Sequence, residues 1–214
     1  MTGLIFPHNK LIMGGAVVLP PLSLALGGNA SSGSDATNYT FNSVNIGAAS
    51  ADRLVIVGAT LGGGGRAVNS ISIAGIDGTL HAGEGDAWLA SRVVASGTTG
   101  TIIVRCSGST YRCGICVWVL KDYQSAIPTD TYAAWNNDMT IDVDAGGVIC
   151  AVCHNYNTSA ISWDLLTLNH DLSIEGSSRL SGASAEFASA DTNKVVTPTF
   201  GTENYPTIAA CSWR

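Results

Sequence analysis

Charged residues are scarce in this sequence, and lysine is the scarcest of them. Only 12% of the 214 residues are charged, about half the share of an average soluble domain, and lysine occurs only as Lys10, Lys121 and Lys194. The formal net charge is −6 and no basic stripe exists, so nucleic acid is not expected as a partner. Low charge favours a surface covered by other subunits, although a small-residue β-protein would have the same composition.

Helical periodicity and long uninterrupted apolar runs are absent as well. No stretch repeats apolar residues at the helical period, and the apolar run at residues 11–26 is broken by Pro20-Pro21. A run that is this short and kinked does not cross a bilayer as one helix, so no membrane span is expected. Gly62–Arg66 lacks the Lys and Ser/Thr of a phosphate loop, and no Gly-x-Ser-x-Gly motif lies between a strand and a helix.

Short apolar segments separated by glycine-rich turns are abundant instead. Met139–Val143 alternates apolar and polar side chains, as a strand with one buried face does, whereas Leu54–Val57 is continuously apolar, as in a strand covered on both faces. We expect strands at residues 39–46, 53–59, 68–74, 88–94, 101–106, 113–120, 139–143, 148–154, 161–166, 186–189, 195–197 and 207–213. This spacing predicts an all-β fold, an antiparallel two-sheet sandwich of the jelly-roll kind, over residues 38–214.

The first 37 residues differ from this body and are interpreted as an extended N-terminal arm with a flexible joint. Gly27–Ala36 is rich in Gly and Ser, as a joint would be. A retained signal or membrane anchor, or an ordinary first strand, are the alternatives. The candidate anchoring residues of the arm are Leu11, Ile12, Val17, Val18, Leu19, Pro20, Pro21 and Leu22.

The order of strand and turn types resembles the surface proteins of tailed bacteriophages, from about residue 39 to the C-terminus. The segments that carry the resemblance are Asp52–Val57, Val68–Ile76, Asp86–Ala90, Gly97–Val104, Cys113–Leu120, Arg179–Ala188 and Pro206–Arg214. It is a pattern of structure with no active-site motif, so it transfers no functional residue. It implies a β-sandwich displayed on a virion, as a head decoration or spike or in a tail fibre or baseplate, with an apolar arm that docks on the particle.

The cysteines form two C-x-x-C pairs, Cys113 with Cys116 and Cys150 with Cys153, a spacing that can hold zinc. Both pairs fall in expected strands, where side chains three positions apart point to opposite faces and their thiolates diverge. We therefore expect buried free thiols that act as small hydrophobic groups. Zinc is one alternative, and a disulfide between Cys106 and Cys113 is another, disfavoured in a reducing cytoplasm. Cys150–His154 also matches the C-x-x-C-H pattern of covalent haem attachment, but it lies in an expected strand with no helix around it.

Catalytic and metal-binding constellations are weak. His81–Asp86 places three potential ligands in a glycine-rich segment, but without the spacing of a calcium loop, so a solvated turn is expected. His8 and His170 have no defined partner in the sequence. Paired carboxylates for glycan cleavage remain the enzymatic alternative. We expect a chain that is not an enzyme and that needs no cofactor.

Two of the five tryptophans have polar neighbours. Trp118 and Trp213 lie in apolar strands and are expected in the core, whereas Trp135 and Trp163 stand beside Asn, Asp or Ser. Trp135 and Trp163 are therefore the candidate contacts for a subunit interface or a carbohydrate, with burial in the core as the third interpretation.

These observations together predict a structural protein of a phage virion, assembled in the host cytoplasm. Its expected partners are other capsid or tail proteins and copies of itself, with a trimer as the first guess. The alternative function is a receptor- or carbohydrate-binding module for host adsorption.

Overall fold

The structure is a computed structural model that describes residues 22–63, 66–135 and 138–214, and these residues form strands and turns without a helix. The all-β class is thus confirmed. The first nine strands are β1 (Ser23–Ser32), β2 (Ala36–Asn45), β3 (Leu54–Leu61), β4 (Val68–Ile73), β5 (Ile76–Asp77), β6 (Thr79–Glu84), β7 (Ala87–Val93), β8 (Thr99–Thr110) and β9 (Cys113–Lys121). The others are β10 (Asp130–Ala134), β11 (Met139–Val143), β12 (Gly147–Asn155), β13 (Ile161–Trp163), β14 (Thr167–Ile174), β15 (Ser178–Phe187), β16 (Asp191–Val196), β17 (Pro198–Phe200) and β18 (Thr207–Trp213).

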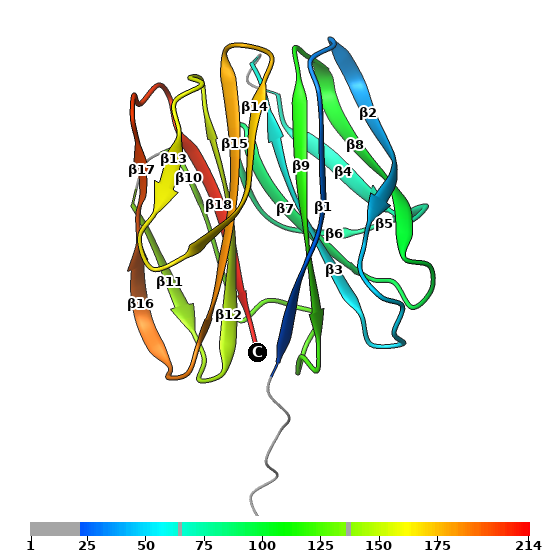
Figure 1. The fold of residues 1–214 in the computed structure, drawn as a ribbon, viewed down its shortest axis with the longest axis vertical. Coiled ribbons are helices and arrows are strands. Elements are labelled where there is room, and N and C mark those ends of the chain that lie inside the picture. Colours follow the sequence, from blue (N-terminus) through cyan, green and yellow to red (C-terminus); the bar gives the residue numbers. More distant parts are fainter. Residues whose placement is uncertain (1–21, 64–65, 136–137) are drawn as a thin grey trace, which may run out of the picture.

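The strands form five antiparallel sheets in place of the expected two. A first large sheet has the order β1-β9-β3-β7-β6, and a second large sheet has the order β10-β18-β12-β15-β14. A four-stranded sheet, β2-β8-β4-β5, and two small sheets, β11-β16 and β13-β17, complete the described strands. Figure 1 shows them as four layers side by side, with the two large sheets in the middle.

Three hydrophobic cores fill the spaces between these layers. Strand β3 shows how the sequence builds two of them at once, because it is apolar on both faces. Val55 and Val57 face the four-stranded sheet, whereas Leu54 and Ile56 face the second large sheet. The third core lies between the second large sheet and the two small sheets. Continuously apolar strands are therefore the ones that separate two cores, as the sequence analysis expected.

The two halves of the chain repeat one strand order. In the first half, residues 23–121, the first strand pairs with the last, the last with β3, and β3 with β7. In the second half, residues 130–213, the first strand pairs with the last, the last with β12, and β12 with β15. Each half thus contributes one large sheet to the middle of the molecule and one outer layer.

The N-terminal boundary differs from the expectation. Ser23–Ser32 is strand β1, which pairs with β9 on both sides of an irregularity between Leu26 and Asn29, so Gly27–Ala36 is not a flexible joint. Asn29 also contacts the second half, with its Nδ2 3.1 Å from His170 Nδ1. Leu22, placed in the arm by the sequence analysis, is buried in the middle core. The other candidate anchoring residues, Leu11, Ile12, Val17, Val18, Leu19, Pro20 and Pro21, lie outside the described residues.

The middle core is narrow where Trp118 crosses it. A Cβ on Gly58 of β3 would lie 2.9 Å from the Cys116 sulfur and 3.1 Å from the Trp118 ring. A Cβ on Gly182 of β15 would lie 2.7 Å from the same sulfur and 3.0 Å from the same ring. Two glycines, one on each large sheet, thus make room for one fully buried indole. Glycine in a strand interior costs stability on its own, and close approach is the reason for it here.

We expect Gly182→Ala to lower the free energy of unfolding by about 1–3 kcal/mol, the usual cost of overpacking a core. The added methyl has no space between the Cys116 sulfur and the Trp118 ring. Urea denaturation monitored by tryptophan fluorescence measures the change. Gly201→Ala is the control, because its nearest neighbour would be the Ser159 side chain at 3.3 Å. Equal stability of the two variants would contradict the packing argument.

Candidate functional site

The two C-x-x-C pairs lie within strands, as expected, and their thiols diverge. Cys113 faces the outer core of the first half, whereas Cys116 faces the middle core. Cys150 faces the middle core and Cys153 the core of the second half. All six cysteines of the chain are free and buried, and burial raises the pKa of each thiol. The prediction that they act as small buried hydrophobic groups is confirmed.

The segment His81–Asp86 is not the solvated turn that was expected. Most of it is strand β6, and its three candidate ligands have separate partners. His81 Nε2 lies 2.7 Å from Ser91 Oγ, and Glu84 accepts a hydrogen bond of 2.9 Å from Trp135 Nε1. Asp86 is completely buried and accepts a hydrogen bond of 2.8 Å from the Tyr156 hydroxyl.

Glu84 and its neighbours form a surface hollow that contains two indole rings, which we call the tryptophan pocket. It has a volume of about 280 Å³ and is lined by Arg66, Ala67, Gly83, Glu84, Gly85, Trp88 and Trp135. Its residues come from both halves, because Trp135 follows β10 whereas the others precede β4 or belong to the β6–β7 hairpin. The structure thus brings a residue of the second half onto the surface of the first.

Gly83 and Gly85 leave the space that the two indole rings occupy. A Cβ on Gly83 would lie 2.0 Å from the Trp88 ring, and a Cβ on Gly85 would lie 2.2 Å from the Trp135 ring. Both rings therefore lie directly against the backbone of the hairpin. Each ring is also held by its N–H group, since Trp88 Nε1 donates to the Gly85 carbonyl at 2.9 Å and Trp135 Nε1 donates to Glu84. Contacts within the protein thus fix the positions of both rings.

Trp135 and Trp163 have different environments. Trp135 is 49% exposed. Trp163 lies in β13, packs against the core of the second half and donates from Nε1 to Ser181 Oγ at 2.7 Å. Of these two tryptophans, Trp135 lines the tryptophan pocket and Trp163 does not. Trp118 and Trp213 are fully buried, as predicted.

Behind the tryptophan pocket, a group of buried polar side chains, together with the half-buried Tyr156, closes one end of the middle core. We call it the polar cap; its members are Thr60, Asp86, His154, Tyr156, Ser178 and Thr207. His154 lies on β12 two positions after Val152, which faces Gly58, so Thr60 on β3 comes opposite His154. Nδ1 of His154 is 4.0 Å from Asp86 Oδ2. Among the described residues, both ring nitrogens of His154 and Oδ1 of Asp86 have no hydrogen-bond partner, a costly arrangement for buried groups.

Asp86 and His154 have opposite effects on the pH dependence of stability. Burial raises the pKa of Asp86 from 3.8 to about 6, so the folded chain holds the extra proton in this window and stability falls as pH rises. Burial lowers the pKa of His154 from 6.5 to about 3, so the unfolded chain holds the extra proton there and stability rises with pH. The two windows overlap, and the two contributions largely cancel.

Replacing Asp86 by Asn removes one of these contributions. We expect the unfolding free energy of Asp86→Asn, relative to the parent chain, to rise by about 2–3 kcal/mol from about pH 4 to about pH 7. Urea melts at several pH values measure this difference. Asp35→Asn, which removes an exposed carboxylate, controls for the loss of one negative charge. A constant difference between Asp86→Asn and parent would show that Asp86 does not titrate in this window.

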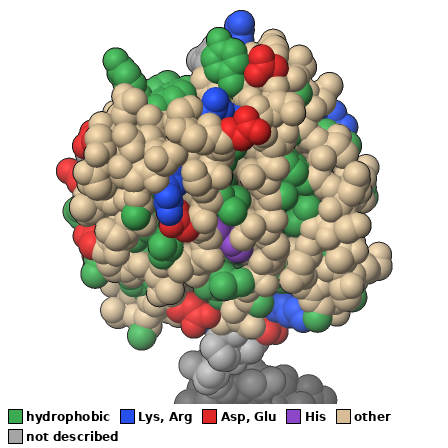
Figure 2. Space-filling model, turned by 45° about the horizontal axis from the view of Figure 1, so that its top comes forward, with side chains coloured by type: hydrophobic (Ala, Val, Ile, Leu, Met, Phe, Trp, Pro, Cys, Tyr) green, Lys and Arg blue, Asp and Glu red, His purple; other side chains and the backbone are tan. Residues whose placement is uncertain are grey.

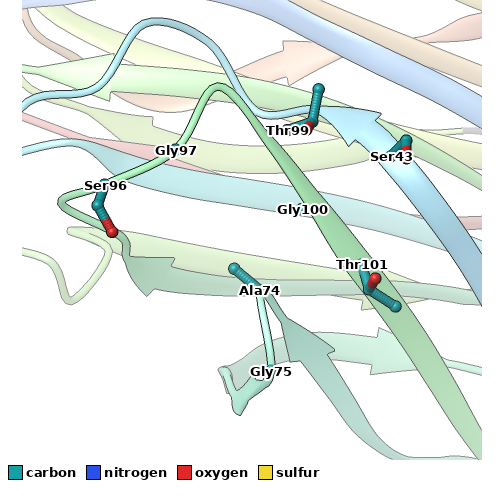
Figure 3. Close-up of a pocket in the computed structure, with 8 residues that line it drawn as sticks. All are labelled: Ser43, Ala74, Gly75, Ser96, Gly97, Thr99, Gly100 and Thr101. Atoms are coloured by element: carbon teal, nitrogen blue, oxygen red, sulfur yellow. The ribbon is translucent and has the colours of Figure 1, made fainter.

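A larger hollow at the other end of the first half has no aromatic or charged residue in its lining. It measures about 520 Å³ and is lined only by small residues, Ser43, Ala74, Gly75, Ser96, Gly97, Thr99, Gly100 and Thr101. Figure 3 shows their side chains spread around the hollow without converging on one point. The carbonyls of Ser96 and Gly97 are instead engaged from inside, where they accept hydrogen bonds of 2.7 and 2.8 Å from buried Arg53.

The histidine without an assigned partner in the sequence, His170, is part of the interior. It lies in β14, and its Nε2 is 3.2 Å from the Val117 carbonyl oxygen on the opposite large sheet. Burial lowers its pKa. His170 therefore helps to join the two large sheets and is no part of the tryptophan pocket. His8 lies outside the described residues.

Comparison with known proteins gives no match to a family model, a curated protein or a solved structure. The part of the chain that the structure describes contains no helix that could span a membrane.

Proposed function

We propose that this chain is a structural protein of a phage virion, displayed on the particle surface and docked through the segment that precedes β1. The observation that carries the proposal is the position of the chain ends. Leu22, where the described chain begins, and Trp213 pack in the same core. Figure 1 shows the start of β1 and the C-terminus at the same end of the molecule. We call this end, where the described chain begins, the docking end.

The opposite end, which we call the free end, is proposed to contact a receptor on the host. Ala134 pairs with Ile208 and Glu84 with Ala87, at the ends of strands far from Leu22. Trp135 is the residue after Ala134, and Glu84 lines the tryptophan pocket, so the pocket lies at this end. A docking segment at one end and an exposed pocket at the other is the arrangement that a displayed adsorption protein needs.

We also propose that each half is a jelly roll. With β5 and β6 counted as one bent strand, the sheets of the first half read 1-8-3-6-5 and 2-7-4-5, the jelly-roll order with one strand shared between the sheets. With β16 and β17 counted as one strand, the second half reads 1-8-3-6-5, 2-7 and 4-7. Two such units in one chain give a rigid body suited to display. Figure 2 shows a surface with few charged groups, as in proteins that pack among neighbours.

Removal of residues 1–20 should abolish attachment and leave the fold intact, because Leu22 and β1 remain in place. Full-length and shortened protein are each added to purified particles of a deletion mutant, made from the phage that encodes this chain by removing its gene. We expect only full-length protein to sediment with the particles. Circular dichroism and melting temperature serve as the folding control. Equal sedimentation of both proteins would refute docking through this segment, and absence of the chain from wild-type particles would refute the display role.

The displayed form is proposed to be a homo-oligomer, with a trimer as the first guess. Support comes from the low content of charge and from apolar side chains such as Ile127 and Tyr205, which are 73% and 72% exposed. Multi-angle light scattering of the full-length protein at micromolar concentration measures the mass. A single species of about 22 kDa would refute the oligomer.

A further inference from the structure

The pairing of aromatic faces with opposite charges in the tryptophan pocket points to one class of ligand. We propose that the pocket binds one uncharged sugar unit of a host-surface glycan. The inference rests on the proposed receptor-binding role of the free end, but it does not depend on how the chain docks on a particle.

The indole rings supply a rigid apolar surface. Both rings lie on glycine backbone, and both N–H groups are already donated within the protein, so neither ring turns without losing a hydrogen bond. What remains available to a ligand is the exposed part of the rings, mainly that of Trp135, which is 49% exposed, because Trp88 also packs against the outer core of the first half. A pyranose presents a patch of C–H groups on one side of its ring, and such a patch packs on an indole face. An indole ring whose N–H group is already bonded offers an apolar face, and the C–H patch of a sugar ring complements that face.

The rim of the pocket carries one charge of each sign. Glu84 and Arg66 are both exposed and both line the hollow. For an anion the attraction of Arg66 is opposed by the repulsion of Glu84, and for the ammonium groups that aromatic cages otherwise attract the opposite holds, so the rim gives a ligand of either sign little net attraction. Together they offer an acceptor and a row of donors, which hydroxyl groups satisfy in both directions. A neutral polyol therefore complements this rim better than an anion or a cation.

The size of the pocket limits the ligand to a single unit. Its volume of about 280 Å³ lies just below the roughly 300–1,000 Å³ of pockets that enclose drug-sized ligands. One hexose unit fits the hollow while the remainder of a glycan stays outside. We expect a weak single-site affinity, of the order of millimolar, that several copies on one particle raise by avidity.

The test uses the full-length protein on a glycan array that carries neutral, acidic and amino-sugar glycans. We expect binding to neutral glycans, followed by titration of the best monosaccharide through the change in tryptophan fluorescence. Trp135→Ala should weaken binding about tenfold or more without changing the melting temperature, because this side chain is half exposed. Glu84→Gln should weaken it less, because the amide oxygen still accepts hydrogen bonds. Trp163→Phe, a change remote from the pocket, is the matched control and should bind as the parent does.

Several outcomes would overturn the inference. These are no binding to any neutral glycan, a preference for sialylated or phosphorylated glycans, displacement by tetramethylammonium chloride, or full binding by Trp135→Ala. Each leaves the docking experiment with residues 1–20 unaffected. Conversely, a chain that binds neutral glycans through Trp135 but is absent from virions would keep the sugar site and lose the display role.

Discussion

The structure depends on the contact between the two large sheets. Trp118 fills the narrow space between them, and Gly58 and Gly182 let the backbones come close enough to enclose it. Because each half of the chain supplies one of these sheets, the contact is also what joins the halves. The tryptophan pocket and the buried polar cap both contain residues of the two halves, so this contact fixes their geometry.

The contact between the sheets also buries the polar cap, and this burial lowers stability. The middle core is apolar over most of its length and ends in Asp86 and His154. Burial raises the pKa of Asp86 and lowers the pKa of His154. Hydrogen bonding from Tyr156 satisfies only one oxygen of the carboxylate. The stability lost at these groups has to be offset by the apolar packing below them. Asp86 lies next to Gly85, so the turn that supports Trp135 also carries this buried charge.

Local patterns predicted the strands whose side chains alternate or are wholly apolar. The predicted bounds of Met139–Val143 and Thr207–Trp213 agree with β11 and β18, and the burial of the cysteines followed from their strand context. Strand β1 was missed because Gly27 and Gly28 are typical of a joint, whereas Gly27 is required by its closeness to Val117. Its pairing partner, β9, lies some ninety residues away, beyond what a local pattern detects.

The tryptophan pocket was predictable only in part. Polar neighbours singled out Trp135 as a surface residue, but they did so equally for Trp163, which packs on a core. The partners of Trp135 are Glu84 and Gly85, about fifty positions earlier, and a glycine that seats a ring has the same sequence signature as a glycine in a turn. The doubling of the strand order was missed for a similar reason, because register between distant strands leaves no periodic signal.

The direction of β1 determines how the molecule carries a mechanical load. The strand begins at Ser23 at the docking end and runs antiparallel to β9 over most of its length, from Ser23 opposite Lys121 to Ser32 opposite Cys113. A pull on the segment before Leu22, resisted by a ligand at the free end, acts along the strand axis. The inter-strand hydrogen bonds are then loaded together in shear, whereas a pull across the strand would break them one at a time. The strand that follows the proposed docking segment is thus arranged to resist being drawn out.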